Sequence, residues 1–242
     1  QNDALLSHAT PIEPLYQLYR ALRSWREKNE LVMEARQEYR WIMNSEKQIE
    51  QIEPYEKLIS QKLVEECMVA TNRSAANFLS ENNATGPFVN HFGFRQDRHE
   101  EVKHFLNIHS ANLMSKDLNN LYDYREIITT LSSKTQVLPL RSMINRLLAR
   151  AELSVNPGPH MGMNIHAYAN CTSPLRKCVD FLTHIQIKSI LRGEKADVVN
   201  SKLLRQIEDR IGNARKTASE AENWLAANYL QRLKLRGFQQ FE

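Results

Sequence analysis

Residues 167–184 read AYANCTSPLRKCVDFLTH, and this stretch decides both the local fold and the candidate site. The hydroxyl residues Thr172 and Ser173 stand directly before Pro174, an order typical of a helix N-cap followed by proline at the first helical position. The pattern predicts a helix from Pro174 to about Leu191. Free amides at such a helix start, with the positive end of the helix dipole behind them, favour binding of an anion.

Two cations follow this predicted helix start at once. Arg176 and Lys177 place positive charge in the first turn, where it opposes the helix dipole, and phosphate binding would require such a concentration of charge. Arg176, Asp180 and His184 recur every four residues, so we expect them to share one helix face. Spacing alone leaves two interpretations open. One is a phosphate site, and the other is an ordinary exposed ion pair of Arg176 with Asp180, worth less than about 1 kcal/mol.

Outside this stretch the sequence alternates helical patterns with a few short extended ones. Apolar residues at helical spacing predict helices at about 14–31 (after Pro14), 55–79, 97–109, 116–131, 139–150 and 199–235. Alternating apolar and polar residues predict a hairpin of 39–43 and 48–52 ended by Pro54, a strand at 151–155 and an extended stretch at 164–171. The fold class is therefore α+β, helix-dominant, with a small antiparallel β component.

Composition excludes several classes of protein. The 242 residues are 42% hydrophobic and 25% charged, as in a soluble globular chain. No apolar run approaches the roughly 20 residues that a membrane-spanning helix needs. With 7 glycines and no G-x-G-x-x-G or Walker-type loop, the chain lacks a nucleotide cradle. Three cysteines, an odd number without paired spacing, suit a reducing compartment. We expect a cytoplasmic monomer that makes no membrane contact.

Charge is distributed unevenly along the chain. Residues 1–134 hold 16 Lys or Arg and 19 Asp or Glu, a net charge of −3, whereas residues 135–242 hold 16 and 9, a net charge of +7. A chain polarised in this way suggests that its second half faces a polyanion such as nucleic acid. A basic surface that is merely solvated explains the same numbers, so charge alone leaves both interpretations open.

No metal site emerges from the spacing of ligand-type residues. His99 and His104 stand five apart, about 140° around a helix, whereas the zinc-protease motif needs a spacing of four. Carboxylates occur as adjacent pairs at 65–66, 100–101 and 208–209. Adjacent helical residues diverge by about 100°, so neither member of a pair converges with the other on one ion.

A longer motif carries the most specific information. Its matching positions are Tyr168, Thr172, Ser173, Pro174, Leu175, Arg176, Lys177, Asp180 and His184. This run resembles the Y-x-x-x-T-S-P-[IL]-R-[RK]-x-x-D-x-x-x-H signature of the ribonuclease II/ribonuclease R family. Residues 157–163 (PGPHMGM) resemble the P-x-x-H-[FM]-G-L turn of that family, and residues 65–72 (EECMVATN) resemble its E-E-x-M-x-x-A-N helix. The segment from Trp25 through Trp41 and the hairpin after it also fit, so the resemblance covers nearly the whole chain.

The resemblance implies hydrolysis of single-stranded RNA from the 3′ end, releasing nucleotides, with magnesium as cofactor. The implied mechanism is in-line attack by a metal-activated water on the last phosphodiester. Arg176 would be the catalytic residue that contacts the scissile phosphate. The implied RNA-binding residues are Thr172, Ser173 and Lys177 on neighbouring phosphates, Glu65 near the terminal nucleotide, and Tyr168. Asn72, seven residues after Glu65, is expected to be a structural hydrogen bonder.

The sequence also departs from the family pattern. The magnesium-binding D-x-D-D run has no counterpart, and we expect it upstream of Gln1, with the flanking OB-fold domains likewise outside residues 1–242. The chain is then a partial RNB catalytic domain that holds no metal ligands and is inactive alone. Met33, Ala218 and Cys178 replace an aromatic residue, a glutamate and a tyrosine of the family. These substitutions favour an alternative: a degenerate, non-catalytic relative that binds RNA or a protein partner.

Overall fold

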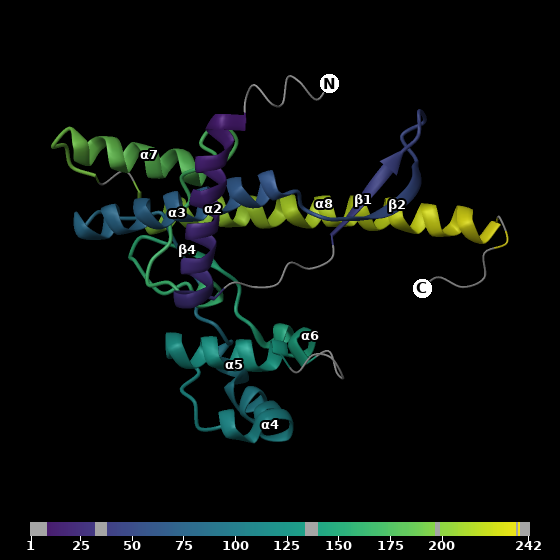
Figure 1. Cartoon of the computed structure of the whole chain (residues 1–242), viewed down its shortest axis with the longest axis horizontal. Helices are drawn as coiled ribbons and strands as arrows, with labels where there is room; N and C mark the ends of the chain where they lie inside the picture. The colour runs from purple at the N-terminus through teal and green to yellow at the C-terminus, as the bar shows by residue number, and fades with distance from the viewer. Residues whose placement is uncertain (1–8, 32–37, 134–139, 197–198, 236, 238–242) are drawn as a thin grey trace. The chain divides into compact units, whose positions relative to one another are not determined.

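The computed structural model describes residues 9–31, 38–133, 140–196, 199–235 and 237, and it contains two compact units. The large unit comprises residues 1–33 and 60–205, and the small unit comprises residues 34–59 and 206–242. Helices dominate both units and the described strands form two antiparallel pairs, so the predicted helix-dominant α+β class is confirmed (Figure 1). In the part of the chain that the structure describes, every helix is too short or too polar to cross a membrane.

The large unit contains most of the helices. They are α2 (Ala9–Asn29), α3 (Ile59–Glu81, whose first residue belongs to the small unit), α4 (His99–Ser110), α5 (Leu121–Ser133), α6 (Leu140–Ile144), α7 (Cys178–Leu191) and the first turn of α8 (Ser201–Leu235). Its two strands, β3 (Phe88–Asn90) and β4 (Glu152–Ser154), pair antiparallel. Short 3₁₀ turns occupy Gln96–Arg98, Ala111–Leu113, Asn145–Leu147 and Met161–Met163.

Two apolar clusters hold the large unit together. The larger cluster joins α4, α5 and α6, where fully buried residues such as Leu106, Ile127 and Ile144 meet. The smaller cluster lies behind the candidate site, because Ala76 and Leu79 of α3 pack against Phe88 and against Ala167 and Ala169. The smaller cluster therefore fixes the backbone that leads into residues 172–177.

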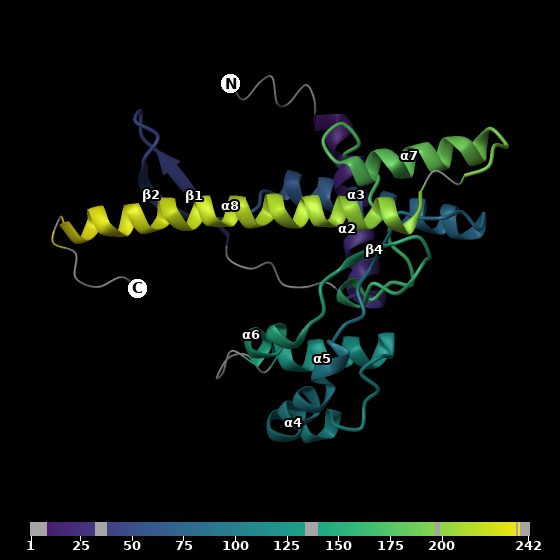
Figure 2. The same ribbon diagram turned by 180° about the vertical axis from the view of Figure 1, so that it is seen from behind.

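The small unit consists of a hairpin and the remainder of α8. Strands β1 (Glu38–Met43) and β2 (Ile49–Tyr55) pair antiparallel, and the hairpin lies beside α8 in both views (Figures 1 and 2). Arg232 of α8 attaches the helix to the hairpin by donating to the Gln48 side chain and to the Ile49 carbonyl at 2.6 Å. Pro54 was expected to end the hairpin, but it lies within β2, opposite Tyr39. In a two-stranded sheet each strand is an edge, where proline is tolerated.

Several predicted boundaries differ from the structure. The first helix contains Pro14 and begins before it, at Ala9. The helix expected at 139–150 is instead α6 followed by a 3₁₀ turn. Residues 164–171, predicted to be extended, are all described and form no regular strand, although Ile165 makes an isolated antiparallel bridge with His160. The Tyr168 carbonyl accepts the Val89 amide at 2.7 Å. The predicted strand at 151–155 is confirmed as β4.

Candidate functional site

The segment Thr172–Lys177 forms a closed turn rather than the start of a helix. Helix α7 begins at Cys178, and its N-cap, Lys177, has an extended backbone with φ −123° and ψ 115°. The Ser173 carbonyl accepts the amides of Arg176 (3.2 Å) and Lys177 (3.0 Å). The prediction that Pro174 opens a helix is therefore wrong, and two of the amides expected to be free there, those of Arg176 and Lys177, are bonded within the turn.

Asp180 stabilises this turn from the first turn of α7. Its side chain is buried, and Oδ2 accepts the Ser173 amide at 2.8 Å. Oδ1 has no hydrogen-bond partner among the described residues. The expected pair of Arg176 with Asp180 is not formed, and the two residues do not share a helix face, because Arg176 precedes the helix. The Asp180 side chain thus binds the backbone of the turn, and the Arg176 side chain is exposed to solvent.

Asn72 of α3 anchors the backbone just before the turn. Its Nδ2 donates to the Tyr168 hydroxyl at 2.8 Å, and its Oδ1 accepts the Cys171 amide at 2.9 Å and the Cys171 thiol at 3.3 Å. Burial raises the pKa of the Cys171 thiol. From α7, His184 Nε2 donates to the Cys171 carbonyl at 2.7 Å. The predicted structural role of Asn72 is confirmed, and one amide side chain ties residues 168–171 to α3.

Two histidines support Tyr168 from behind. His91 and His160 stack with ring centroids 5.4 Å apart, and His160 meets Tyr168 edge-on at 5.6 Å. His91 Nδ1 accepts the amides of Gly93 and Gly162, which requires a neutral ring. Burial, and then the nearby His91, lower the pKa of His160 to about 4. Burial also raises the pKa of Tyr168. The stack is therefore a packed, uncharged support for the site.

A group of alternating charges joins α2 to α3 next to this support, and we call it the charge cluster. It consists of Arg23, Arg26, Glu30, Glu66 and Arg73. Glu66 accepts from Arg26 at 2.8 Å and from Arg23 at 3.2 Å, and Arg26 contacts Glu30 at 3.2 Å.

The charge cluster is largely buried, since Glu66, Glu30 and Arg26 are 2%, 4% and 8% exposed. The Arg73 guanidinium, bonded to Glu30, lies 4.3 Å from the centre of the Trp25 ring. The sequence patterns did not predict this cluster. The four-residue spacing of Arg26 and Glu30 was its only local signal.

The structure separates the predicted site residues into two groups. Tyr168, Thr172 and Ser173 are half-buried on the segment anchored by Asn72, whereas Arg176 and Lys177 are exposed on the turn. Among the described residues no carboxylate lies within 4 Å of either cation. Glu65 is exposed on α3, two helical turns or about 10.5 Å along the axis from Asn72. It borders a shallow hollow that is also lined by Ser60, Gln61, Val64 and Met68.

The three departures from the family pattern occupy different surroundings. Cys178 is exposed as the first residue of α7, beside the turn. Ala218 is exposed on α8 and belongs to the small unit. Met33 lies outside the described residues. Of the three, Cys178 is therefore the one that the structure places next to the predicted site.

The residues that the structure describes do not fit a magnesium site. In the described ranges no three His, Cys, Asp or Glu side chains converge in a group that holds a metal ion. The buried carboxylates are already engaged, Asp180 by the Ser173 amide and Glu66 by two arginines. What the site provides is a rigid turn that projects positive charge and hydroxyl groups.

Comparison with known proteins gives this geometry a context. The sequence model of the RNB domain family matches residues 1–193. Exoribonuclease 2 of Yersinia enterocolitica is 32% identical over 224 residues, which are 92% of this chain and 34% of that protein. Exoribonuclease 2 of Cronobacter sakazakii is 30% identical over 223 residues, again 92% and 34%. The chain thus spans about a third of the length of these curated relatives.

Solved structures share the fold at lower sequence identity. Mycoplasma genitalium RNase R, in complex with ribose-methylated single-stranded RNA, has a TM-score of 0.63 at 16% identity, covering 89% of this chain and 34% of that one. Yeast Ssd1, described as a pseudonuclease, has a TM-score of 0.50 at 13% identity, covering 63% and 19%. Identities this low show a common fold and nothing more.

Proposed function

The chain belongs to the RNB domain family, and from this premise we propose that it is part of an enzyme that hydrolyses single-stranded RNA from its 3′ end. The observation that carries the proposal is the turn at residues 173–177. Asp180 and Asn72 fix its backbone from within the fold, while Arg176 and Lys177 face solvent without a carboxylate partner among the described residues. Because the turn is held in place and its two cations have no carboxylate partner among the described residues, these cations are suited to binding an anion from outside the protein.

The polar side chains of residues 172–177 have distinct chemical uses toward phosphate. The planar Arg176 guanidinium donates two parallel hydrogen bonds to a phosphate, and it stabilises charge that develops there. The Lys177 ammonium acts as a point charge, and the hydroxyls of Thr172 and Ser173 add neutral donors. We propose that Arg176 contacts the scissile phosphate and that the other three hold its neighbours. Tyr168 then supports the turn from behind, and Glu65 lies further along α3.

We propose that magnesium assists the reaction through ligands outside these 242 residues. Magnesium requires several oxygen ligands at octahedral positions, and the described carboxylates do not converge on one point. We therefore expect cleavage to depend on a carboxylate cluster that the described residues do not supply. The three cysteines, none of them in a disulfide, support a reducing location such as the cytoplasm.

The first experiment tests the metal part of this proposal on the chain itself. The purified 242-residue protein is incubated with single-stranded RNA and excess magnesium or manganese. We expect RNA binding that weakens steeply with salt, because bound phosphates release counterions. We expect no release of nucleotides. Release from the 3′ end, abolished by Arg176→Ala so that a contaminant is excluded, would show that the chain holds its own metal site.

A second experiment tests catalysis with a chimera. In exoribonuclease 2 of Yersinia enterocolitica the matching third is replaced by this chain, so that the relative supplies every other residue. We expect the chimera to shorten single-stranded RNA from the 3′ end. Arg176→Lys should slow the chemical step in single-turnover kinetics by roughly a hundredfold with RNA affinity nearly unchanged, because an ammonium cannot stabilise the transition state through two parallel hydrogen bonds.

A non-catalytic RNA-binding module is the second candidate, and specific residues favour it. Met33, Cys178 and Ala218 replace residues expected from the family pattern. The chimera separates the two candidates. If it folds and binds RNA with the affinity of the relative yet does not shorten it, the non-catalytic function replaces the catalytic one. Restoration of cleavage by Ala218→Glu would identify which departure is responsible.

A further inference from the structure

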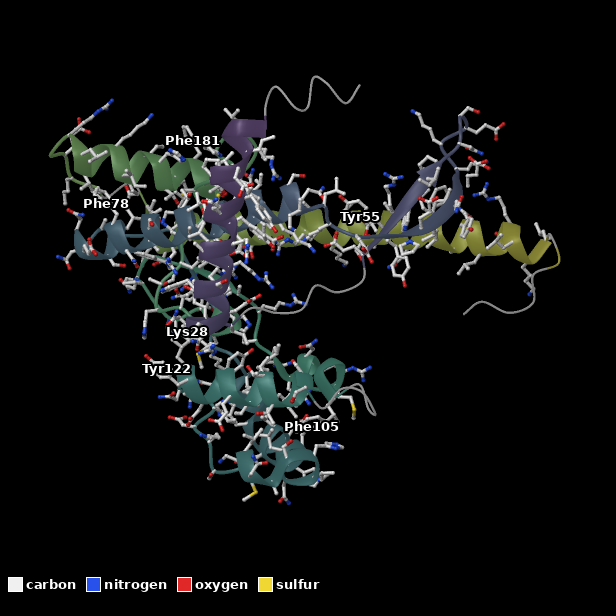
Figure 3. The ribbon with its side chains drawn as sticks, in the orientation of Figure 1. Lys28, Tyr55, Phe78, Phe105, Tyr122 and Phe181 are labelled. Carbon is white, nitrogen blue, oxygen red and sulfur yellow. The ribbon has the colours of Figure 1, made fainter. Side chains whose placement is uncertain are left out.

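The exposed face of α7 carries a line of side chains, and the proposed function uses only the first of them. It begins at Lys177 and continues with Phe181, Lys188 and Arg192, all exposed, and we call it the α7 stripe (Figure 3 labels Phe181). The buried residues of the helix are Val179, Asp180, Leu182, Thr183 and Gln186, and Gln186 lies opposite Lys177 around the axis. The burial pattern thus fixes which side of α7 faces solvent.

Helical geometry aligns these four residues. Phe181, Lys188 and Arg192 follow Lys177 by four, eleven and fifteen positions, which places them within about 60° of it around the axis. The rise of about 1.5 Å per residue puts them roughly 6, 16 and 22 Å along the helix. The stripe therefore begins at the Ser173–Lys177 turn and extends away from it in one direction.

The charge on the stripe is uncompensated. The only acidic residue on α7 is Asp180, which is buried and bonded to the Ser173 amide. In the described part of the chain no carboxylate lies within 4 Å of Lys177, Lys188 or Arg192. Helix α4 differs, because its cations are matched locally: Lys103 contacts Glu100 at 3.6 Å, and Arg98, its N-cap, pairs with Glu101. Charge complementarity thus points to an anionic ligand for α7.

Phe181 favours single-stranded nucleic acid among the possible polyanionic ligands. Phe181 is 53% exposed and lies between the cations of the stripe. A surface that bound only phosphate groups would need no aromatic ring at this position. An exposed aromatic ring between cations matches the requirements of single-stranded nucleic acid, whose bases stack on aromatic faces while the backbone follows positive charge. A duplex has no free base faces to offer at this position.

We propose that the α7 stripe binds the single-stranded RNA that leads away from the turn, with phosphates on Lys188 and Arg192 and one base stacked on Phe181. This inference rests on the proposed function, because it takes the turn as the place where the RNA end is held. It adds a binding surface beyond the turn and makes affinity depend on RNA length.

Affinity for a trinucleotide and for a decanucleotide, measured by fluorescence anisotropy with the 242-residue chain, tests the inference. The trinucleotide reaches only the turn, whereas the decanucleotide also covers the stripe. For the double variant Lys188→Gln/Arg192→Gln we expect roughly tenfold weaker decanucleotide binding, a salt slope reduced by about 1.4, and unchanged trinucleotide binding. Phe181→Leu should weaken decanucleotide binding about fivefold or more, because leucine offers no ring on which a base can stack.

A control with the same loss of charge is Arg146→Gln/Arg150→Gln, which changes two exposed arginines before β4. It should leave both affinities unchanged. Equal weakening by the control, or equal affinity of the wild type for both lengths, would overturn the stripe while the proposed function stands. If the same variants weaken the binding of an RNA duplex by the same factors, the assignment of the stripe to single-stranded RNA is overturned. If neither oligonucleotide binds, the proposed function fails and the stripe fails with it.

Discussion

The charge cluster between α2 and α3 and the turn at residues 173–177 use similar side chains in opposite ways. In the charge cluster, Glu66 and Arg26 are buried and every charge meets an opposite one. On the turn, Arg176 and Lys177 are exposed and no carboxylate lies within 4 Å in the described residues. A buried charge without its partner costs several kcal/mol, whereas an exposed one costs almost nothing. The charges of the cluster are therefore engaged within the fold, and the cations of the turn are available for a ligand.

The largest effect on stability is expected from breaking the charge cluster. Glu66→Gln removes the carboxylate that faces Arg23 and Arg26 and leaves Arg26 buried with reduced compensation. We expect a loss of about 3 kcal/mol or more in the free energy of unfolding, measured with urea. The neighbouring Glu65→Gln changes an exposed residue and should cost less than about 0.5 kcal/mol. Similar losses for both variants would show that the buried cluster does not stabilise the fold.

The anchor of the turn should have the next largest effect. Asn72→Ala leaves the Cys171 amide and the Tyr168 hydroxyl without their partner, and we expect a loss of about 2 kcal/mol. Hydrogen exchange at the Cys171 amide should accelerate at the same time. Thr71→Ala serves as the control, because it removes an exposed methyl group and a hydroxyl that donates to the Cys67 carbonyl one turn earlier. Unchanged exchange at Cys171 in Asn72→Ala would contradict the anchoring role.

Lowering the pH should destabilise the protein through His160, which lies in the histidine stack behind the turn. The pKa of His160 falls from 6.5 in the unfolded chain to about 4 in the folded protein, so between these values the unfolded state binds more protons. Stability is therefore complete above about pH 6.5 and declines as the pH falls toward 4. From this residue we expect a loss of about 2 kcal/mol between about pH 7 and pH 5. His160→Phe should reduce that loss, and an unchanged pH dependence in urea unfolding would refute the assignment.

The smallest effect on stability, with a clear effect on binding, is expected at the turn. Arg176→Gln should change the free energy of unfolding by less than about 0.5 kcal/mol, because the side chain has no carboxylate partner among the described residues. RNA affinity should fall about tenfold, and the salt slope should fall by about 0.7 for each phosphate that the variant no longer neutralises. Arg95→Gln, an exposed arginine paired with Asp97 at 2.7 Å, is the matched control and should bind RNA normally. If Arg176→Gln lowers the free energy of unfolding by more than this, Arg176 contributes to stability as the charge cluster does, and the contrast between the two regions fails.

Local sequence patterns determined much of this protein. Apolar spacing predicted the helices, and the alternation at 151–155 predicted β4, because those patterns report contacts within one or two turns or along one strand. The long T-S-P-L-R-K motif identified the family and singled out the segment that the structure presents to solvent. The separate resemblance at residues 65–72 identified Asn72 as a structural residue before any partner was visible.

Only the tertiary structure decided how that segment is held. Asn72 reaches Tyr168 and Cys171 across 96 and 99 residues, and Glu66 reaches Arg26 across 40, distances at which no periodic pattern operates. The same holds for the start of α7. By local preference Pro174 begins a helix, but the Asp180 carboxylate binds the Ser173 amide and the helix begins four residues later. Residue type determined which groups carry charge, and packing determined which of those charges are left for a ligand.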